Sequence, residues 1–360
     1  MTVPTTMGAM VTMGHGDLDQ MVWHDDWPTP VPQAGEVLVR VAACGLNNTD
    51  VNTRAGWYSK AVTEATTGGA FAEVAQEDPT WGGAPIAFPR IQGADVCGHI
   101  AAVGAGVDPA RIGERVIADS WLRDPSDPDD MNKTGYFGSE RDGGFAEFTT
   151  IPAQNALAVA SDLSDAELAT FSCSYSTAEG MLDRADVRDS DTVLVPGASG
   201  GVGGALVQLA KLRGARVIAM ASEAKHTDVA KLCPDMILPR APANLRAALG
   251  SEKITVIADV VGGPFWPNLI DVLERGGRYT CSGAIAGPTA APDPPTLYLR
   301  DLTFAGSTVI PHSVMRNLVR YIEDGAIKAN LAATYPLKDL RTAQAAFIAK
   351  EHVGNIVVIP

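Results

Sequence analysis

The sequence predicts a two-domain α/β protein that combines a doubly wound parallel sheet with a compact, barrel-like β domain. The chain has 360 residues, more than a single hydrophobic core usually serves. Strand and helix patterns alternate with short connections after residue 190, as in a parallel sheet wrapped by helices. Before residue 160, short valine-rich strands are separated by glycines, which is typical of a small β barrel.

The first part of the chain carries the patterns of the β domain. Within Gly35–Ala43, valine and leucine alternate with other residues, as in a half-buried strand. Further strands are predicted at Ala94–Val107, Gly113–Ala118 and Gly143–Pro152. Between them, Ser59–Pro89 combines glycine, alanine, proline and acidic residues without a clear period, so we predict a long surface loop, and such loops are usually functional or mobile.

From residue 162 onward, helical and strand patterns follow one another. Asp162–Arg184 has helical spacing, and Ser164 with Glu167 forms a candidate capping box. Strands are predicted at Thr192–Val195, Val217–Met220, Ile254–Val261, Arg278–Ser282 and Gly354–Pro360. Helices are predicted at Val202–Leu212, Ala224–Leu232, Trp266–Glu274, Val314–Glu323 and Leu337–Lys350. This alternation with short connections indicates a parallel sheet wrapped by helices.

Composition limits the classes of function. The formal net charge of −14 disfavours nucleic acid and anionic membranes as partners, and no lysine or arginine cluster offsets it. No apolar run of about 18 residues predicts a membrane span. The first twenty residues lack a signal-peptide pattern, so we expect the cytoplasm. The five cysteines are scattered without a CxxC pair, which favours reduced thiols.

A glycine-rich turn is the clearest chemical motif. Residues 192–204 read TVLVPGASGGVGG, an apolar strand that leads into glycines and then a helix. Ala198, Gly200 and Gly203 fit the A-x-G-x-x-G spacing of a dinucleotide-binding turn, where the second position lets a pyrophosphate approach and the third lets helix and strand pack closely. A tight turn without a ligand is the alternative, and the strand–turn–helix context favours binding. The predicted contacts are Ala198, Ser199, Gly200, Gly201, Val202 and Gly203.

The end of the second strand of the parallel sheet bears on the choice of cofactor. NAD sites usually carry an acidic residue there for the ribose hydroxyls. Here that place falls at Ala221, followed by Ser222, with Lys225 nearby as a candidate partner of a 2′-phosphate. NADPH is therefore the predicted cofactor. An alignment error would make Glu223 the acid and favour NAD, and Lys225 could equally be a solvated helix residue.

Several motifs occur together in one order along nearly the whole chain. They are Gly93–Val107, Gly113–Val116, Ser176–Ala178, Gly197–Gly203, Asp259–Gly263, Gly276–Arg278 and Gly354–Val358. In this set the chain resembles the medium-chain dehydrogenase/reductase superfamily. The resemblance implies a Rossmann domain inserted into a GroES-like β-barrel domain, with residues 1–160 and the return segment 311–360 forming the catalytic domain and residues 161–310 the NADP-binding domain. It also implies a homodimer formed through the edge of the cofactor sheet.

The zinc ligands of the superfamily's alcohol dehydrogenases are mostly missing. The resemblance places these ligands at Asn47, at Ala94–Asp95 and at Cys173, and only the last is a ligand of the usual kind. Catalytic zinc generally needs three protein ligands. Residues 118–143 hold no cysteine for a structural zinc, and His99 is more easily explained as a structural residue. We therefore predict no metal.

The pattern is more similar to the quinone-oxidoreductase branch, whose Asn-x-x-Asp turn and following Gly-x-Tyr line the active cleft. This resemblance implies catalytic roles for Asn47, Asp50 and Tyr58. The alternatives are that Asn47 and Asp50 close a polar turn and that Tyr58 is ordinary packing. Cofactor contacts toward the nicotinamide are expected at Thr177, Val261, Gly283, Ala284 and Ile285.

The predicted reaction is hydride transfer from NADPH to a quinone or an α,β-unsaturated carbonyl. Without zinc, the carbonyl oxygen needs a donor such as the Tyr58 hydroxyl, the Asn47 amide, a ribose hydroxyl or a water. Lys60–Phe88 lies beside the expected cleft and is a candidate cap for it. The alternatives are an alcohol dehydrogenase, with or without zinc, and a non-catalytic NADPH-binding sensor.

Overall fold

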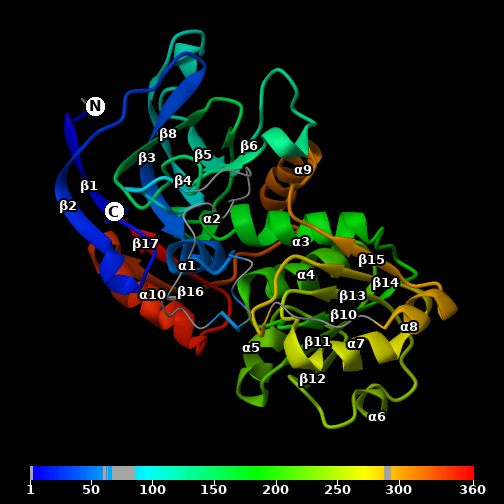
Figure 1. Ribbon diagram of the computed structural model, residues 1–360. Coiled ribbons are helices and arrows are strands. Elements are labelled where there is room, and N and C mark those ends of the chain that lie inside the picture. The colour runs from blue at the N-terminus through cyan, green and yellow to red at the C-terminus, as the bar shows by residue number, and fades with distance from the viewer. Residues whose placement is uncertain (1–2, 60–61, 63, 67–85, 288–292) are drawn as a thin grey trace.

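The computed structural model describes residues 3–59, 62, 64–66, 86–287 and 293–360. The chain forms two main sheets, one in each half of the molecule (Figure 1). Most of the predicted Lys60–Phe88 loop lies outside the described residues. No helix in the described ranges is long and apolar enough to span a membrane.

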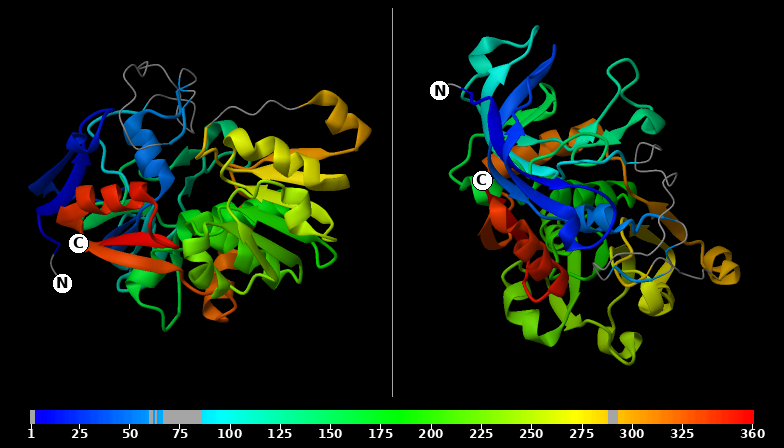
Figure 2. Two further views of the ribbon diagram at one scale, coloured as in Figure 1. Left: turned by 90° about the horizontal axis from the view of Figure 1, so that it is seen from below. Right: turned by 60° about the vertical axis from the view of Figure 1, so that its left-hand side comes forward.

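The β domain is built around one sheet with the strand order β16-β17-β3-β4-β5-β9, in which β8 also pairs with β3. Its strands are β3 (Glu36–Gly45), β4 (Asp95–Val103), β5 (Arg115–Ala118), β8 (Phe148–Pro152), β9 (Ala156–Ala158), β16 (Leu331–Pro336) and β17 (Asn355–Ile359). The last two come from the end of the chain, and Val358 on β17 pairs with Cys44 on β3. Figure 2 shows these C-terminal elements lying beside the N-terminal ones.

Several elements near the N-terminus were not predicted. Strands β1 (Thr6–Thr12) and β2 (Met21–Pro28) form a hairpin, and β1 is buried along almost its whole length, so it shows no alternation of apolar and polar residues. Helix α1 (Asn48–Ala55) begins where a polar turn was the alternative. A short pair, β6 (Trp121–Leu122) and β7 (Gly135–Tyr136), follows later in the chain.

The second sheet has the strand order β12-β11-β10-β13-β14-β15, and all its neighbouring strands are parallel. Its strands are β10 (Thr192–Pro196), β11 (Arg216–Ala221), β12 (Met236–Pro239), β13 (Ile254–Asp259), β14 (Leu273–Cys281) and β15 (Thr303–Gly306). This is the 3-2-1-4-5-6 order of a Rossmann fold. The predicted fold class, a Rossmann sheet combined with a GroES-like β domain, is confirmed.

Helices cover both faces of the parallel sheet (Figure 1). The α-helices that the structure describes after α1 are α2 (Asp165–Leu168), α3 (Ser172–Arg184), α4 (Gly201–Leu212), α5 (His226–Ala230), α6 (Leu245–Leu249), α7 (Trp266–Val272), α8 (Pro294–Leu299), α9 (His312–Glu323) and α10 (Leu340–Ala349). Of these, α2 packs on β3 and β4 and α10 packs on β16 and β17, so both lie against the β domain. The capping box is confirmed, because Ser164 Oγ accepts from the Glu167 N–H and Glu167 accepts from the Ser164 N–H.

One apolar core runs from the parallel sheet into the β domain. On one face of the sheet, α3, α4 and α9 pack on β10, β11 and β13. The same cluster of buried side chains includes Ala43, Cys97 and Ile117 from β3, β4 and β5. The other face of the sheet has its own cluster, which α6 and α7 cover. The two domains therefore share part of one apolar core.

Candidate functional site

The first site residues lie at the start of helix α1. Asn47 is its N-cap, and the Asn47 N–H donates to Asp50 Oδ2 at 2.8 Å. The other Asp50 oxygen accepts the Gly93 N–H at 3.2 Å, and the Asp50 residue is only 4% exposed. Both Asp50 oxygens thus bind main-chain amides. In this arrangement Asp50 holds the helix start against the strand that follows Gly93, and helix α1 begins where a polar turn was the alternative.

A buried hydrogen-bonded chain connects this helix start to helix α3. Asn47 Nδ2 donates to Asp95 Oδ2 at 3.0 Å, and Asp95 Oδ1 accepts the Cys173 N–H at 2.5 Å. Ser174 Oγ donates to Asn355 Oδ1 at 3.0 Å and lies 3.4 Å from Asn47 Oδ1. The three positions where zinc ligands were sought, Asn47, Asp95 and Cys173, therefore lie together, but they are hydrogen bonded to one another.

Close backbone packing sets this geometry. Gly45, the partner of Asp95 in the β3–β4 register, has no room for a side chain, because a Cβ there would lie 2.3 Å from the Ala169 carbonyl oxygen. Asp95, the first residue of β4, can therefore reach the Cys173 main chain. The neighbouring Ala94 is fully buried, and its methyl side chain offers no atom that could ligate a metal. In the described part of the chain, no group of three or more His, Cys, Asp or Glu residues could hold a metal ion.

The carboxyls of Asp50 and Asp95 have strongly perturbed acidity. Burial raises the pKa of each to about 7, and the hydrogen bonds from Asn47, Gly93 and Cys173 oppose the rise only in part. The charge of Asp50 adds to the rise at Asp95. Near neutral pH, one of the two carboxyls, Asp50 or Asp95, can therefore stay protonated next to the Asn47 side-chain amide.

A wall of aromatic and sulfur groups stands next to Asp95. Burial raises the pKa of Cys173, so its side chain stays a thiol, and it hydrogen bonds with Tyr136 and Thr177. The Tyr136 ring packs edge-on against Trp121 with ring centroids 4.9 Å apart. Tyr136 is a site residue that the sequence analysis missed, since the segment around it was examined only for cysteines.

Tyr58 reaches the same group of residues from the end of the α1 segment. It hydrogen bonds with Asn52, and the nearby Asp50 and Cys173 contribute to the raised pKa of Tyr58, which burial dominates. Its ring is edge-on to Trp57. The residue as a whole is 37% exposed, so the burial that raises the pKa concerns the hydroxyl end and not the entire residue.

The glycine-rich turn joins β10 to α4 as predicted. Gly197 has a positive φ of 68°, and a Cβ on Gly203 would lie 2.1 Å from the Gly197 carbonyl oxygen, so only glycine allows this close contact. A Cβ on Gly200 would meet only the Gly197 oxygen, at 3.6 Å, which leaves open space above the N-terminus of α4. This free N-terminus and the open space fit the pyrophosphate of a dinucleotide.

The turn is also tied to the C-terminal return. The Gly354 N–H donates to the Ser199 carbonyl at 2.9 Å, and Gly354 forms a bridge with Gly200. A Cβ on Gly201 would approach Asn355 Oδ1 to 2.2 Å. Ala198 donates its N–H to the Met220 carbonyl of β11, and Val202 is the second residue of α4, so the motif contacts both β11 and the C-terminal return.

The end of β11 carries the residues expected to select the cofactor. Ala221 is buried at 2% exposure, and Ser222 is half-buried at the start of a 3-10 helix, Glu223–Lys225. Glu223 is exposed. Lys225 Nζ donates to the His352 carbonyl at 2.9 Å and to the Lys350 carbonyl at 2.5 Å. Lys225 is thus fixed to the segment after α10 rather than solvated.

The expected nicotinamide contacts follow β13 and β14. Val261 donates its N–H to Asp259 Oδ1 at 2.7 Å and accepts from Ala286 at 2.8 Å, which fixes the turn that contains Gly283, Ala284 and Ile285. The Thr66 N–H donates to the Ile285 carbonyl at 2.9 Å, so the β domain reaches this turn. Thr177 lies one helical turn beyond Cys173 on α3 and is half-buried.

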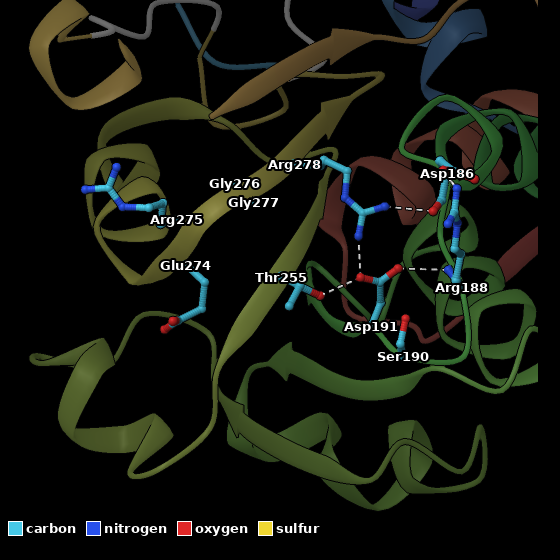
Figure 3. Close-up of a pocket in the computed structure, with 10 residues that line it drawn as sticks. All are labelled: Asp186, Arg188, Ser190, Asp191, Thr255, Glu274, Arg275, Gly276, Gly277 and Arg278. Carbon is cyan, nitrogen blue, oxygen red and sulfur yellow. Dashed lines mark hydrogen bonds and ion pairs between the residues drawn. The ribbon is translucent and has the colours of Figure 1, made fainter. Parts of the chain in front are cut away.

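A separate cavity lies at the amino-terminal ends of the strands of the parallel sheet, opposite the glycine-rich turn. It has a volume of about 420 Å³ and is lined by residues before β10 and at the starts of β13 and β14 (Figure 3). Arg278 crosses it to pair with Asp191 and to donate to the Ala185 and Asp186 carbonyls. Rossmann ligands bind at the carboxyl ends of the strands, so this cavity is distinct from the dinucleotide site.

Comparisons with known proteins show the family to which the chain belongs. The chain matches the family described as "Alcohol dehydrogenase GroES-like domain" over residues 33–161 and the family described as "Zinc-binding dehydrogenase" over residues 201–324. A crystal structure from Sinorhizobium meliloti 1021, of a protein provisionally assigned as an alcohol dehydrogenase, shares 45% sequence identity and a TM-score of 0.91, covering 99% of this chain and 98% of that one. The chain belongs to the medium-chain dehydrogenase/reductase superfamily.

Curated relatives in this superfamily carry several activities. The acryloyl-coenzyme A reductase of Metallosphaera sedula is 25% identical, and the match covers 98% of this chain and 99% of the relative. The quinone oxidoreductase of Rattus norvegicus is 26% identical, covering 94% of this chain and 92% of the relative. Members of the medium-chain dehydrogenase/reductase superfamily are oxidoreductases that bind NAD or NADP, and this general activity applies to the chain.

Proposed function

We propose that this protein is a zinc-independent, NADPH-dependent reductase of quinones or α,β-unsaturated carbonyl compounds. The observation that carries the proposal is the buried chain Asn47–Asp95–Cys173 at the place of the zinc ligands. Asn47 has one amide hydrogen committed to Asp95, Asp95 accepts from the main chain, and Cys173 is a protonated thiol. These groups favour a neutral polar site over a metal centre.

Without a metal, hydroxyl groups are the best donors toward a carbonyl oxygen. When bound, the nicotinamide supplies the hydride. Tyr58 and Tyr136 both have raised pKa values caused mainly by burial, so their hydroxyls stay protonated and able to donate. Cys173 and Trp121 position the Tyr136 side chain, and Asn52 positions that of Tyr58. A donor held in this way would stabilise the enolate or quinol oxygen as negative charge develops.

The substrate class follows from the same site and is supported by the named activities of relatives. Acryloyl thioesters and quinones both present a carbon–carbon double bond conjugated to a carbonyl, which accepts hydride at carbon while charge develops on oxygen. The role of NADPH rests on Ala221 and Ser222, because no acidic side chain occupies the end of β11. We further propose a homodimer formed through β15, the strand at the edge of the parallel sheet.

Steady-state kinetics with NADPH and NADH and a panel of quinones, enones, enoyl thioesters and alcohols test the proposal. We expect turnover of a quinone, enone or enoyl thioester with NADPH. The Y58F and Y136F variants should show that at least one hydroxyl contributes about tenfold or more to kcat, whereas Y298F, which changes a tyrosine that is 65% exposed on α8, should match the parent protein. Turnover of alcohols alone, appearing only after zinc is added, would show an alcohol dehydrogenase instead. Tight NADPH binding without turnover of any compound would favour a sensor.

A further inference from the structure

The residue that ends helix α10 has an unusual conformation for a lysine. Lys350 has a φ of 54° and a ψ of 32°, the left-handed region in which glycine is the usual C-terminal residue. Its side chain folds back, so that Nζ lies 3.5 Å from the Phe347 ring centroid and donates to Asn48 Oδ1 at 2.9 Å. The ammonium group therefore sits at the start of α1, one residue from Asn47.

Main-chain bonds attach the segment after Lys350 to the dinucleotide turn. Four residues later, Gly354 donates to the Ser199 carbonyl and bridges to Gly200. From the other side, Lys225 donates to the carbonyls of Lys350 and His352. The Lys350 ammonium thus belongs to a small region where α1, the glycine-rich turn and the end of β11 converge.

This region has two neighbouring cations and little negative charge. In the described ranges, neither Lys350 nor Lys225 forms an ion pair with a carboxylate. Burial, followed by the charge of Lys225, lowers the pKa of Lys350 to about 7. Burial lowers the pKa of Lys225 as well, and Arg240 adds to that effect while Glu351 opposes it. An anion bound at this place would stabilise the protonated form of both lysines and so raise their pKa values.

We propose that the Lys350 side chain binds the pyrophosphate of the dinucleotide. This inference rests on the proposed function for the identity of the ligand. The pyrophosphate is favoured over the 2′-phosphate because the Lys350 ammonium contacts Asn48, on the side of the reacting groups, and its segment is bonded to Ser199 and Gly200. Ser222, the expected neighbour of a 2′-phosphate, lies next to Lys225 instead.

Binding measurements on K350G and K350R test the proposal. Glycine suits the left-handed conformation, so K350G should melt at or above the temperature of the parent protein. By isothermal titration, K350G should weaken binding of both NADP⁺ and NAD⁺ by about tenfold or more, and by a similar factor for each, because the two share the pyrophosphate. K350R should stay within about threefold of the parent, since it keeps the charge. K338A, which removes an exposed lysine paired with Asp25, is the control and should leave both affinities unchanged.

Three results would overturn the inference. They are parental affinities in K350G, a loss confined to NADP⁺, and equal losses in K350G and K350R. A loss confined to NADP⁺ would assign Lys350 to the 2′-phosphate. Failure of the proposed function has a different signature: the parent protein would bind neither dinucleotide, or would bind them without reducing any member of the substrate panel.

Discussion

Replacing Asp95 with asparagine tests whether the site holds a buried, protonated carboxyl. Asp95 is 1% exposed and joins Asn47 to Cys173. Asparagine has the same shape, and its carbonyl oxygen can still accept the Cys173 N–H. The side-chain N–H of the introduced asparagine can donate to the Asn47 side chain if the Asn47 amide flips so that its oxygen faces position 95. The flipped Asn47 N–H can then donate to Ser174 Oγ, which lies 3.4 Å from Asn47 Oδ1 in the parent protein. The D95N variant should therefore fold and lose only the titrating group.

The expected effect follows from the pKa of Asp95, which is raised from 3.8 to about 7. Because the folded pKa lies above the unfolded one, the folded state holds the proton more tightly. The stability linked to this proton is complete below about pH 4 and is lost as the pH rises toward 7. At 1.36 kcal/mol for each unit of pKa, the loss is at most about 4 kcal/mol in full, and about 3 kcal/mol between pH 5 and pH 8.

Urea unfolding at pH 5 and at pH 8 measures this difference. Between pH 5 and pH 8 we expect the free energy of unfolding of the parent protein to fall by up to about 3 kcal/mol more than that of D95N. D25N is the matched control, because Asp25 is an exposed carboxyl with a lowered pKa caused by its hydrogen bonds with Trp23 and Lys338, so it is already ionised at pH 5. If D95N and the parent protein lose the same stability over this range, Asp95 is ionised throughout and the reasoning is wrong.

Three further predictions concern the cofactor turn, the cofactor choice and the metal. G203A should destabilise the fold by about 1–3 kcal/mol, since its Cβ would lie 2.1 Å from the Gly197 oxygen; G306A, where a Cβ meets nothing within 4 Å, should be close to neutral in the same thermal melts. S222D should shift the ratio of kcat/KM values from NADPH toward NADH by about tenfold or more, because a carboxylate repels a 2′-phosphate, and an unchanged ratio would move the specificity site elsewhere. Dialysis against a chelator should leave the activity intact, whereas a loss that zinc restores would contradict the zinc-free site.

The parallel sheet could be predicted because its signals are local. Apolar strands such as Thr192–Val195, a glycine turn and amphipathic helices each fit within a short window. The β1–β2 hairpin and α1 lack such signals. The β1 strand is buried on both faces, and α1 buries polar residues such as Arg54, whose guanidinium hydrogen bonds to Gln344 and to the Gly16 carbonyl, far away in the sequence.

The candidate site was predictable where a motif names its residues and not where distant segments meet. Asn47 and Asp50 were found through a family pattern, but nothing local shows that both Asp50 oxygens accept main-chain amides. The bonds from Asp95 to Cys173 and from Lys225 to the segment after α10 join residues 78 and 125 or more positions apart. Tyr136 and Lys350 emerged only from the folded arrangement.

The apolar core shared by the two domains limits how this protein can be divided or recombined. Ala43, Cys97 and Ile117 pack in one cluster with the side chains under α3 and α4. If the nucleotide-binding half were excised, these residues would face water, and a graft from a relative would have to match their volumes as well as the loop ends. The two halves must therefore match in their packing, and exchanging a whole domain between relatives would require compensating changes in this shared core.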